Sequence, residues 1–233
     1  TNGKSTTVRM INHILSCWGK NTGMTCTDGI YIGNKVIQRG DCSGFRSART
    51  VLFDPEVEAA VLEIARGGLI RDGLAYEEAD VGIITNITGD HLGLDGINTI
   101  EDLAFVKSLV IEQVKKDGFS VLNADDLTTV QLKDRANGNI IFFSTAEDNL
   151  ILRKHLGQGG HGVFIKDGAI FLAHRDDIKY LVKVKDIPAT LGGRARHNIQ
   201  NALAAAAACW ALGVPLRVIA RALREFECNE THN

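Results

Sequence analysis

The sequence predicts an α/β fold: a mostly parallel sheet of the phosphate-loop type, flanked by helices, with a small antiparallel β flank at about residues 150–190. Three observations predict it. The chain opens on TNGKST, the end of a G-x-x-x-x-G-K-[ST] motif, directly before a helical apolar pattern. Apolar runs such as VGIITNI lack the two-residue alternation of half-buried strands. These runs alternate with helical patterns, as strands and helices do in βαβ units.

Helix and strand patterns follow one another from the N-terminus. The apolar spacing between Val8 and Trp18 predicts a helix that stops at Gly19. The runs AAVLEIA and VGIITNI, between Glu58 and Ile87, predict two strands that are buried on both faces. Next, the patterns predict a helix over 100–116, a buried strand at FSVLNA, a helix over 125–135 and a strand at IIFFS.

The pattern changes after about residue 150. The short runs LILR, GVFI, AIFLA and YLVKV are separated by turns that contain Gly, Asp and His, and they predict the strands of a small antiparallel sheet. The Ala/Leu-rich last stretch carries Gly213 and Pro215 between its halves, which predicts two tightly joined helices. No linker or repeat divides the chain, so we expect one domain over residues 1–233.

Composition excludes several classes of protein. The chain has 26 Lys+Arg against 28 Asp+Glu, a formal charge of −2, which predicts neither a nucleic-acid partner nor an anionic membrane partner. No apolar stretch reaches the roughly 18 residues of a membrane span, and no targeting segment is visible. Five cysteines without a C-x-x-C pair favour reduced thiols and a cytoplasmic protein.

TNGKST is the most specific motif in the chain. In such a loop, backbone N–H groups at the helix N-terminus hold phosphate oxygens, Lys4 reaches the outer phosphates, and the Ser5 hydroxyl can ligate Mg²⁺. The alternative is a polar N-cap, Asn2 or Ser5, that opens a helix without any ligand. The helix behind the motif favours nucleotide binding.

Polar residues follow two predicted strands at their carboxyl ends. Glu63 interrupts an apolar run, where a carboxylate is costly unless it is paired or bound to a metal. Because ligands of open α/β sheets collect at this edge, Glu63 is placed to meet the Mg²⁺ of a bound nucleotide. A salt bridge from Glu63 to Arg66 or Arg71 is the alternative. Asn86 and His91 cluster after the next strand, at the same edge.

Lys107 and Asn198 are less specific candidates. Lys107 lies on an apolar helical stripe with Leu103 and Val110, so it must either extend to solvent, which is the commoner case, or have a function. Asn198 and Asn201 stand at the start of a predicted helix. Capping is the default interpretation of both, and a hydrogen bond to the edge of a nucleotide base is the alternative.

Together these segments resemble the Mur ligase family over nearly all 233 residues. The order TNGKST, LE, TNITGDHLG, a lysine-bearing helix, LNADD and GR-x-x-HN-x-x-NALAA looks like the family's central ATP-binding domain. The segments CTDGIYIGNKVIQRGDCSGFRSAR and EIARGGLIRDGL look like the members that join L-arginine to the aspartate side-chain carboxylates of a polymer. Peptidoglycan-precursor ligases and folylpolyglutamate synthases are weaker matches in these loops.

The resemblance implies a role for each matching position. Residues expected to bind ATP are Thr1, Asn2, Gly3, Lys4, Ser5, Thr6, Asn86 (near the γ-phosphate) and Asn198 (near the adenine). Ser5 and Glu63 would hold one Mg²⁺, and His91 would help to hold a second. Lys107 matches a lysine that many members carbamylate, and the expected catalytic residues are Lys4, His91 and Lys107. Loop residues expected near the acceptor are Thr27, Asp28, Arg66 and Arg71.

The implied reaction is ATP-dependent amide formation with release of ADP and phosphate. A carboxylate attacks the γ-phosphoryl group, and the incoming amine displaces the resulting acyl phosphate. Relative to the family, the chain lacks the strand before Thr1 and a Rossmann-like domain after Asn233. We therefore expect a fragment with little ligase activity by itself, from a protein that forms homo-oligomers. A different phosphate-loop kinase or NTPase, or a non-catalytic nucleotide-binding domain, remain as alternatives.

Overall fold

The structure is a computed structural model that describes residues 3–89, 92–93 and 96–227. The helices are α1 (Lys4–Cys17), α2 (Phe45–Leu52), α3 (Arg66–Asp72), α4 (Ile100–Glu112), α5 (Leu127–Gln131), α6 (Leu150–Gly157), α7 (Arg196–Ala211) and α8 (Leu216–Glu225). The strands are β1 (Thr22–Cys26), β2 (Gly29–Ile32), β3 (Lys35–Arg39), β4 (Ala59–Leu62), β5 (Ala79–Ile84), β6 (Val114–Asn123), β7 (Asn139–Ser144), β8 (His161–Lys166), β9 (Ala169–His174) and β10 (Asp177–Lys183). Short 3-10 helices span Leu132–Arg135, Val184–Asp186 and Pro188–Thr190.

The strands form two sheets. The larger has the order β10-β9-β8-β7-β6-β5, in which β5 to β8 pair in parallel and β8, β9 and β10 pair antiparallel. The smaller has the order β3-β2-β1-β4, in which β1 and β4 are parallel and the β1-β2-β3 pairings are antiparallel. The predicted α/β fold, with helices around the sheets and an antiparallel flank, is confirmed.

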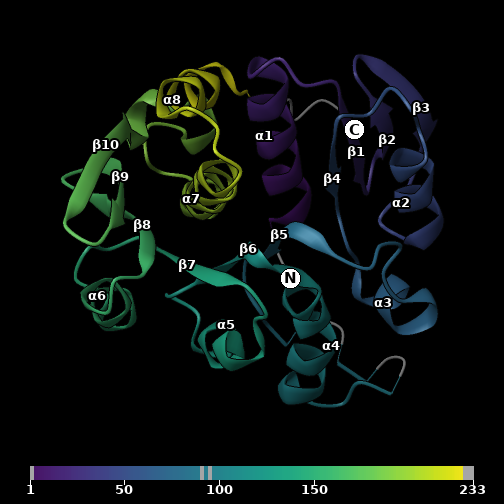
Figure 1. Ribbon diagram of the computed structural model, residues 1–233, viewed down its shortest axis with the longest axis horizontal. Helices are drawn as coiled ribbons and strands as arrows, with labels where there is room; N and C mark the ends of the chain where they lie inside the picture. Colours follow the sequence, from purple (N-terminus) through teal and green to yellow (C-terminus); the bar gives the residue numbers. More distant parts are fainter. Residues whose placement is uncertain (1–2, 90–91, 94–95, 228–233) are drawn as a thin grey trace.

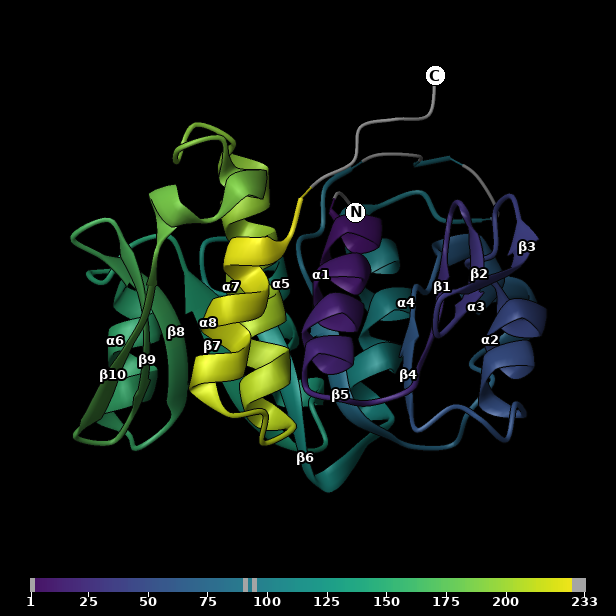
Figure 2. The same ribbon diagram turned by 90° about the horizontal axis from the view of Figure 1, so that it is seen from above.

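Helices cover both faces of the larger sheet (Figure 1). α7 packs against β6, β7 and β8 on one face, with α1 and α8 beside it, while α4, α5 and α6 lie on the other face. The alanines of α7 from Ala202 to Ala208 are all buried, since their small side chains let the helix approach its neighbours closely. Figure 2 shows α1, α7 and α8 side by side. None of the described helices is long and apolar enough to cross a membrane.

The sequence-based boundaries agree with the structure in most places. α1 ends one residue before Trp18, and Gly19 follows in a left-handed conformation (φ 89°), as the apolar spacing predicts. The two C-terminal helices and the helix at 125–135, which is partly 3-10, are confirmed. Cys17, Cys26, Cys42 and Cys209, the cysteines among the described residues, are free thiols, as their spacing favours.

Three predictions of secondary structure are wrong. LILR belongs to α6 instead of a strand, because the Asn149 side chain accepts hydrogen bonds from the N–H groups of Ile151 and Leu152 and so caps a helix there. The helix predicted over 100–116 ends at Glu112, and Val114 already begins β6. β4 and β5 are strands but are not buried on both faces, since each has an exposed residue.

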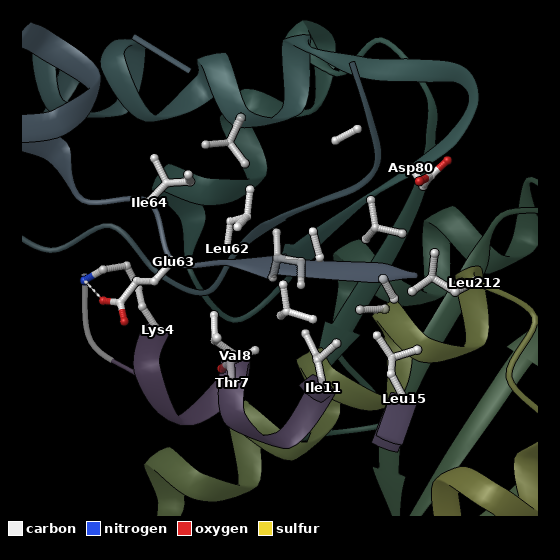
Figure 3. Close-up of a pocket in the computed structure, with 18 of the residues that line it drawn as sticks. Lys4, Thr7, Val8, Ile11, Leu15, Leu62, Glu63, Ile64, Asp80 and Leu212 are labelled. Carbon is white, nitrogen blue, oxygen red and sulfur yellow. Dashed lines mark ion pairs between the residues drawn. The ribbon is translucent and has the colours of Figure 1, made fainter. Parts of the chain in front are cut away.

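An apolar groove separates the two sheets where β4 and β5 face each other (Figure 3). Its volume is about 450 Å³, and it runs beneath α1 from Lys4 and Glu63 at one end to Leu15 and Leu212 at the other. β4 pairs with β1 and β5 pairs with β6, and among the described residues neither strand has a second partner. The partial exposure of β4 and β5 follows from this groove.

Candidate functional site

The site begins at the N-terminus of α1. Gly3 occupies the N-cap position with φ 84°, and glycine has no side chain that could cap the first turn. Backbone N–H groups at such a helix N-terminus can donate hydrogen bonds to an anion. A Cβ at Gly3 would lie 2.1 Å from Oδ1 of Asn201, so both the backbone angle and the close approach require glycine. The alternative of Ser5 as a polar N-cap is wrong, because Ser5 lies within the first turn.

A buried carboxylate stands directly beside this turn. Glu63 follows the last residue of β4, and its side chain is only 1% exposed. Oε2 of Glu63 accepts a hydrogen bond from the Ser5 hydroxyl at 2.6 Å, and Oε1 lies 3.8 Å from Nζ of Lys4. Figure 3 shows the ion pair of Lys4 and Glu63. These two partners offset the cost of burying the charge. The structure therefore brings together Lys4, Ser5 and Glu63 from two separate elements.

Thr27 completes a set of oxygen ligands. Its hydroxyl lies 3.1 Å from that of Ser5, and it follows β1, the strand next to β4. The oxygens of Ser5, Thr27 and Glu63 thus come from α1, the β1-β2 turn and the end of β4. Oxygen donors with one carboxylate are the ligands that Mg²⁺ prefers, so this donor set fits the ion.

The remaining candidates from the smaller sheet and α3 have other surroundings. Asp28 forms an ion pair with Arg9 of α1. Arg71 is exposed, and its guanidinium lies over Gly67, where a Cβ would approach Nη1 to 3.3 Å. The partners of Glu63 are Ser5 and Lys4, and not Arg71, which was one of the two partners in the alternative interpretation. Arg66, at the start of α3, contributes its charge to the surroundings of Lys107.

Lys107 reaches the same site from α4. It lines the groove together with Lys4 and Glu63, although it shares a helix stripe with buried Leu103. Burial lowers the pKa of Lys107 to about 8, and the positive charges of Lys4 and Arg66 act in the same direction. The side chain does not simply extend into solvent, which was the commoner expectation for a lysine at this position.

Asn86 also lines the groove, two residues after the end of β5. The polar ends of β4 and β5 therefore meet at one edge, as expected from parallel strands. Thr6 lies in the first turn of α1. Three of the predicted site residues, Thr1, Asn2 and His91, lie outside the described part of the chain.

Asn198 does not cap a helix, which was its default interpretation. α7 has Ala195 at its N-cap without a side-chain cap, so neither Asn198 nor Asn201 caps it. Nδ2 of Asn198 donates to the carbonyl of Ala189 at 2.8 Å, and its Oδ1 accepts from Nδ2 of Asn201 at 3.2 Å. Asn201 in turn accepts from the hydroxyl of Thr7 at 3.2 Å. Asn198 is thus connected to the first turns of α1.

The sequence gives no indication of Thr7 or Asp126 in this arrangement, and it suggests Asn201 only as a cap or a partner of a base edge. Asn201 and Thr7 connect helices whose residues are 194 positions apart, and no local pattern signals such a contact. Asp126 caps α5 and accepts a hydrogen bond from the N–H of Ile87 at 2.6 Å, which fixes the loop after β5. The consecutive aspartates of LNADD, directly before a helix, are the signal that could have identified Asp126.

The glycine that precedes α1, the buried glutamate directly after β4 and the half-buried lysine of α4 define a phosphate-loop α/β protein. Residues 1–209 match the family described as Mur ligase middle domain, so the chain belongs to this family. It is 42% identical to the cyanophycin synthetase of Trichormus variabilis (strain ATCC 29413 / PCC 7937) over 229 residues, which are 98% of this chain and 25% of that protein. The chain therefore spans about a quarter of that relative's length.

More distant members of the family match as well. The UDP-N-acetylmuramoylalanine--D-glutamate ligase of Thermoanaerobacter sp. (strain X514) is 29% identical over 97% of this chain and 43% of that protein. The solved structure of a UDP-N-acetylmuramoyl-L-alanyl-D-glutamate--2,6-diaminopimelate ligase superposes with a TM-score of 0.74, covering 97% of this chain and 45% of that one. Sequence identity in the superposition is 18%, so this similarity establishes the fold alone.

Proposed function

We propose that this chain is the ATP-binding part of an ADP-forming amide ligase that joins L-arginine to the aspartate side-chain carboxylates of a polymer. One observation carries the proposal: the buried Glu63 carboxylate lies against Ser5 and Lys4 at an uncapped helix N-terminus. This combination pairs an anion-binding turn with a ligand set for a divalent cation. The choice of arginine and aspartate is supported by the 42% identity to a cyanophycin synthetase.

The first turn of α1 would hold the phosphates of ATP. Its N–H groups donate to phosphate oxygens, and Lys4 places a positive charge at the outer phosphate. Ser5, Thr27 and Glu63 would hold Mg²⁺, which supplies charge neutralisation for phosphoryl transfer. Phosphoryl transfer needs mainly positioning and electrostatic stabilisation, so no side chain has to act as a nucleophile for an acyl phosphate to form.

Lys107 would serve this site as a carbamate. Carbamylation requires a neutral amine, and a pKa of about 8 leaves about a tenth of Lys107 neutral at pH 7, against about 0.03% at the ordinary value. The ammonium would first lose a proton, and the neutral amine would then attack CO₂, forming an N–C bond and releasing a second proton. The resulting carbamate is an anion, which the neighbouring positive charges of Lys4 and Arg66 would stabilise. We also retain the expectation that His91 helps to bind a second Mg²⁺.

The groove supports the expectation that a further strand belongs to this fold. Among the described residues, the facing edges of β4 and β5 lack a partner strand, and a parallel strand between them would complete a continuous sheet. A strand that precedes Thr1 would enter α1 through the phosphate loop, since Lys4 lies at one end of the groove. The two sheets would then form one.

A chimera tests the proposed reaction. The segment of the Trichormus variabilis cyanophycin synthetase that matches this chain over 229 residues is replaced by this chain. ADP release and polymer-bound radiolabelled arginine are then measured together. We expect arginine incorporation that matches ADP release, and loss of both with Glu63→Gln. ADP release without arginine would indicate an NTPase instead, and a folded chimera that binds no ATP would indicate a non-catalytic domain.

A further inference from the structure

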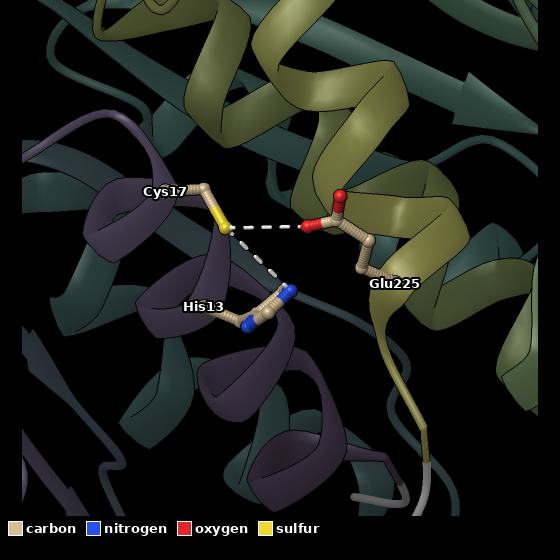
Figure 4. Close-up of side chains that lie close together, drawn as sticks. All are labelled: His13, Cys17 and Glu225. Atoms are coloured by element: carbon tan, nitrogen blue, oxygen red, sulfur yellow. Dashed lines mark hydrogen bonds between the residues drawn. The ribbon is translucent and has the colours of Figure 1, made fainter.

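A second group of metal-ligating side chains lies on the opposite half of α1 (Figure 4). His13 and Cys17 are four residues apart, so both point from the same face of the helix toward α8. Glu225, in the last turn of α8, meets them there. The imidazole, thiol and carboxylate ligand atoms all lie within 4.8 Å of one another.

The distances between these atoms are close to those of a metal site. Sγ of Cys17 lies 3.7 Å from Nε2 of His13 and 4.0 Å from Oε2 of Glu225. A tetrahedral Zn²⁺ with ordinary bond lengths of about 2.0–2.3 Å separates its ligand atoms by about 3.6 Å. The two distances from the sulfur already come within a few tenths of an ångström of that separation, and the third, between His13 and Glu225, is at most 4.8 Å, so side-chain rotations would bring all three atoms to bonding distance.

We propose that His13, Cys17 and Glu225 bind one Zn²⁺ or a similar thiophilic divalent ion at the α1-α8 contact. A thiolate together with an imidazole selects zinc over Mg²⁺, which takes oxygen ligands. Zinc binding forms a sulfur–zinc bond and releases the thiol proton of Cys17 to solvent. The thiolate and the Glu225 carboxylate then balance the two charges of the ion, and water occupies the fourth position.

Neighbouring groups are compatible with this arrangement. Arg221 stands on the other side of the carboxylate, with Nε 3.9 Å from Oε1 of Glu225, so that Oε2 remains directed at Cys17. Its Nη2 donates to the backbone carbonyl of Cys17 at 3.2 Å and leaves the sulfur free of that contact. The ring of Phe226 packs at 5.8 Å from that of His13 and limits its movement.

This site is distinct from the proposed nucleotide site. His13 follows Lys4 by nine residues, which is about 14 Å along the helix axis. The ion would tie the C-terminal half of α1 to the last turn of α8, while the first turn of the same helix holds phosphate. The proposal therefore concerns how α1 is anchored, and it stands whether or not the chain belongs to a ligase.

Cobalt and zinc titrations of the reduced, purified chain test the site. We expect one Co²⁺ per chain, a thiolate-to-cobalt charge-transfer band, displacement of Co²⁺ by Zn²⁺, and a higher melting temperature with Zn²⁺. Cys17→Ser should abolish the band and weaken Zn²⁺ binding more than about 10-fold, since loss of a direct ligand exceeds the effect of an outer neighbour. His13→Gln and Glu225→Gln should weaken binding as well.

Two exposed residues give matched controls, His197→Gln and Glu227→Gln, and both should bind Zn²⁺ like the parent chain. Circular dichroism establishes that each variant is folded. The proposal is overturned if the folded parent chain gives no charge-transfer band, or if Cys17→Ser retains the band, because another thiol would then be the ligand. Equal weakening by the control variants would also overturn it.

Discussion

Replacing Lys107 by methionine tests whether the chain carries this lysine at a cost to stability. The pKa of Lys107 is about 8 in the folded chain, against 10.5 for an ordinary lysine, a difference of about 2.5 units. At about 1.4 kcal/mol per unit, holding the ammonium in the folded state costs about 3 kcal/mol. Partial exposure of the side chain reduces this to about 2 kcal/mol.

The sign of the pH dependence follows from proton binding. Below pH 8 both states bind the proton, and the full penalty is present. Between pH 8 and 10.5 the unfolded chain binds one proton more than the folded chain, so the contribution of Lys107 to stability becomes more favourable as pH rises. Methionine has a similar length and helix propensity without the charge. We therefore expect Lys107→Met to be about 2 kcal/mol more stable at pH 7, with a smaller difference at pH 9.5.

Urea unfolding at the two pH values measures this difference. Lys116→Met, at an exposed position of β6, is the matched control and should change stability by less than about 0.5 kcal/mol. Bicarbonate adds a second readout, because carbamylation would place an anion near Lys4 and Arg66 and stabilise the parent chain but not Lys107→Met. If Lys107→Met is no more stable than the parent at pH 7, the argument from burial and charge is refuted.

Three further predictions concern the phosphate turn and the groove. Glu63→Gln should weaken Mg²⁺-ATP binding by about 10–100-fold in calorimetry. The control Glu56→Gln, at an exposed position, should bind Mg²⁺-ATP like the parent chain. Equal affinities of the two variants would contradict the assigned metal ligands. Gly3→Ala should abolish ATP binding. Gly19→Ala is its control, because Gly19 has a similar positive φ but a Cβ there would meet no atom within 4 Å. That variant should lose only about 1–2 kcal/mol of stability and still bind ATP. A segment of about six apolar residues, added before Thr1, should raise the melting temperature of the chain by binding as a strand in the groove. A charged segment of equal length should not. If both segments change the melting temperature equally, the groove does not bind a strand.

The sequence predicts those helices and turns that are stabilised by interactions between residues close together in the chain. The apolar spacing of α1 and the positive φ at Gly19 are set within a few residues, so both could be read from the sequence. The sequence analysis does not predict the hairpin of β2 and β3, although the Gly33–Asn34 pair between two short apolar runs is a hairpin signal. LILR was ambiguous, because a short apolar run fits strand or helix and the Asn149 cap decided the outcome.

Site residues could be predicted where a polar side chain interrupts an apolar sequence pattern. Glu63 could be identified because a carboxylate in an apolar strand needs a partner, and the structure supplies Ser5 and Lys4. The role of Asn201 could not be identified in this way. Its position depends on how α7 packs against α1, and an asparagine near a helix start is ordinary in the sequence. Contacts between distant segments have no local signature.

The residues of the site come from elements beside both sheets, so the groove between the sheets can affect binding. Glu63 and Thr27 follow strands of the smaller sheet, whereas Lys107 and Asn86 belong to the helix and loop beside the larger one. α1 packs against elements on both sides, through β1 and β4 on one and α7 on the other. If a strand in the groove fixes the distance between the two halves, we expect it to lower the conformational entropy that the proposed nucleotide binding has to remove. Because coupling between two binding events is reciprocal, ATP should then also strengthen binding of the strand.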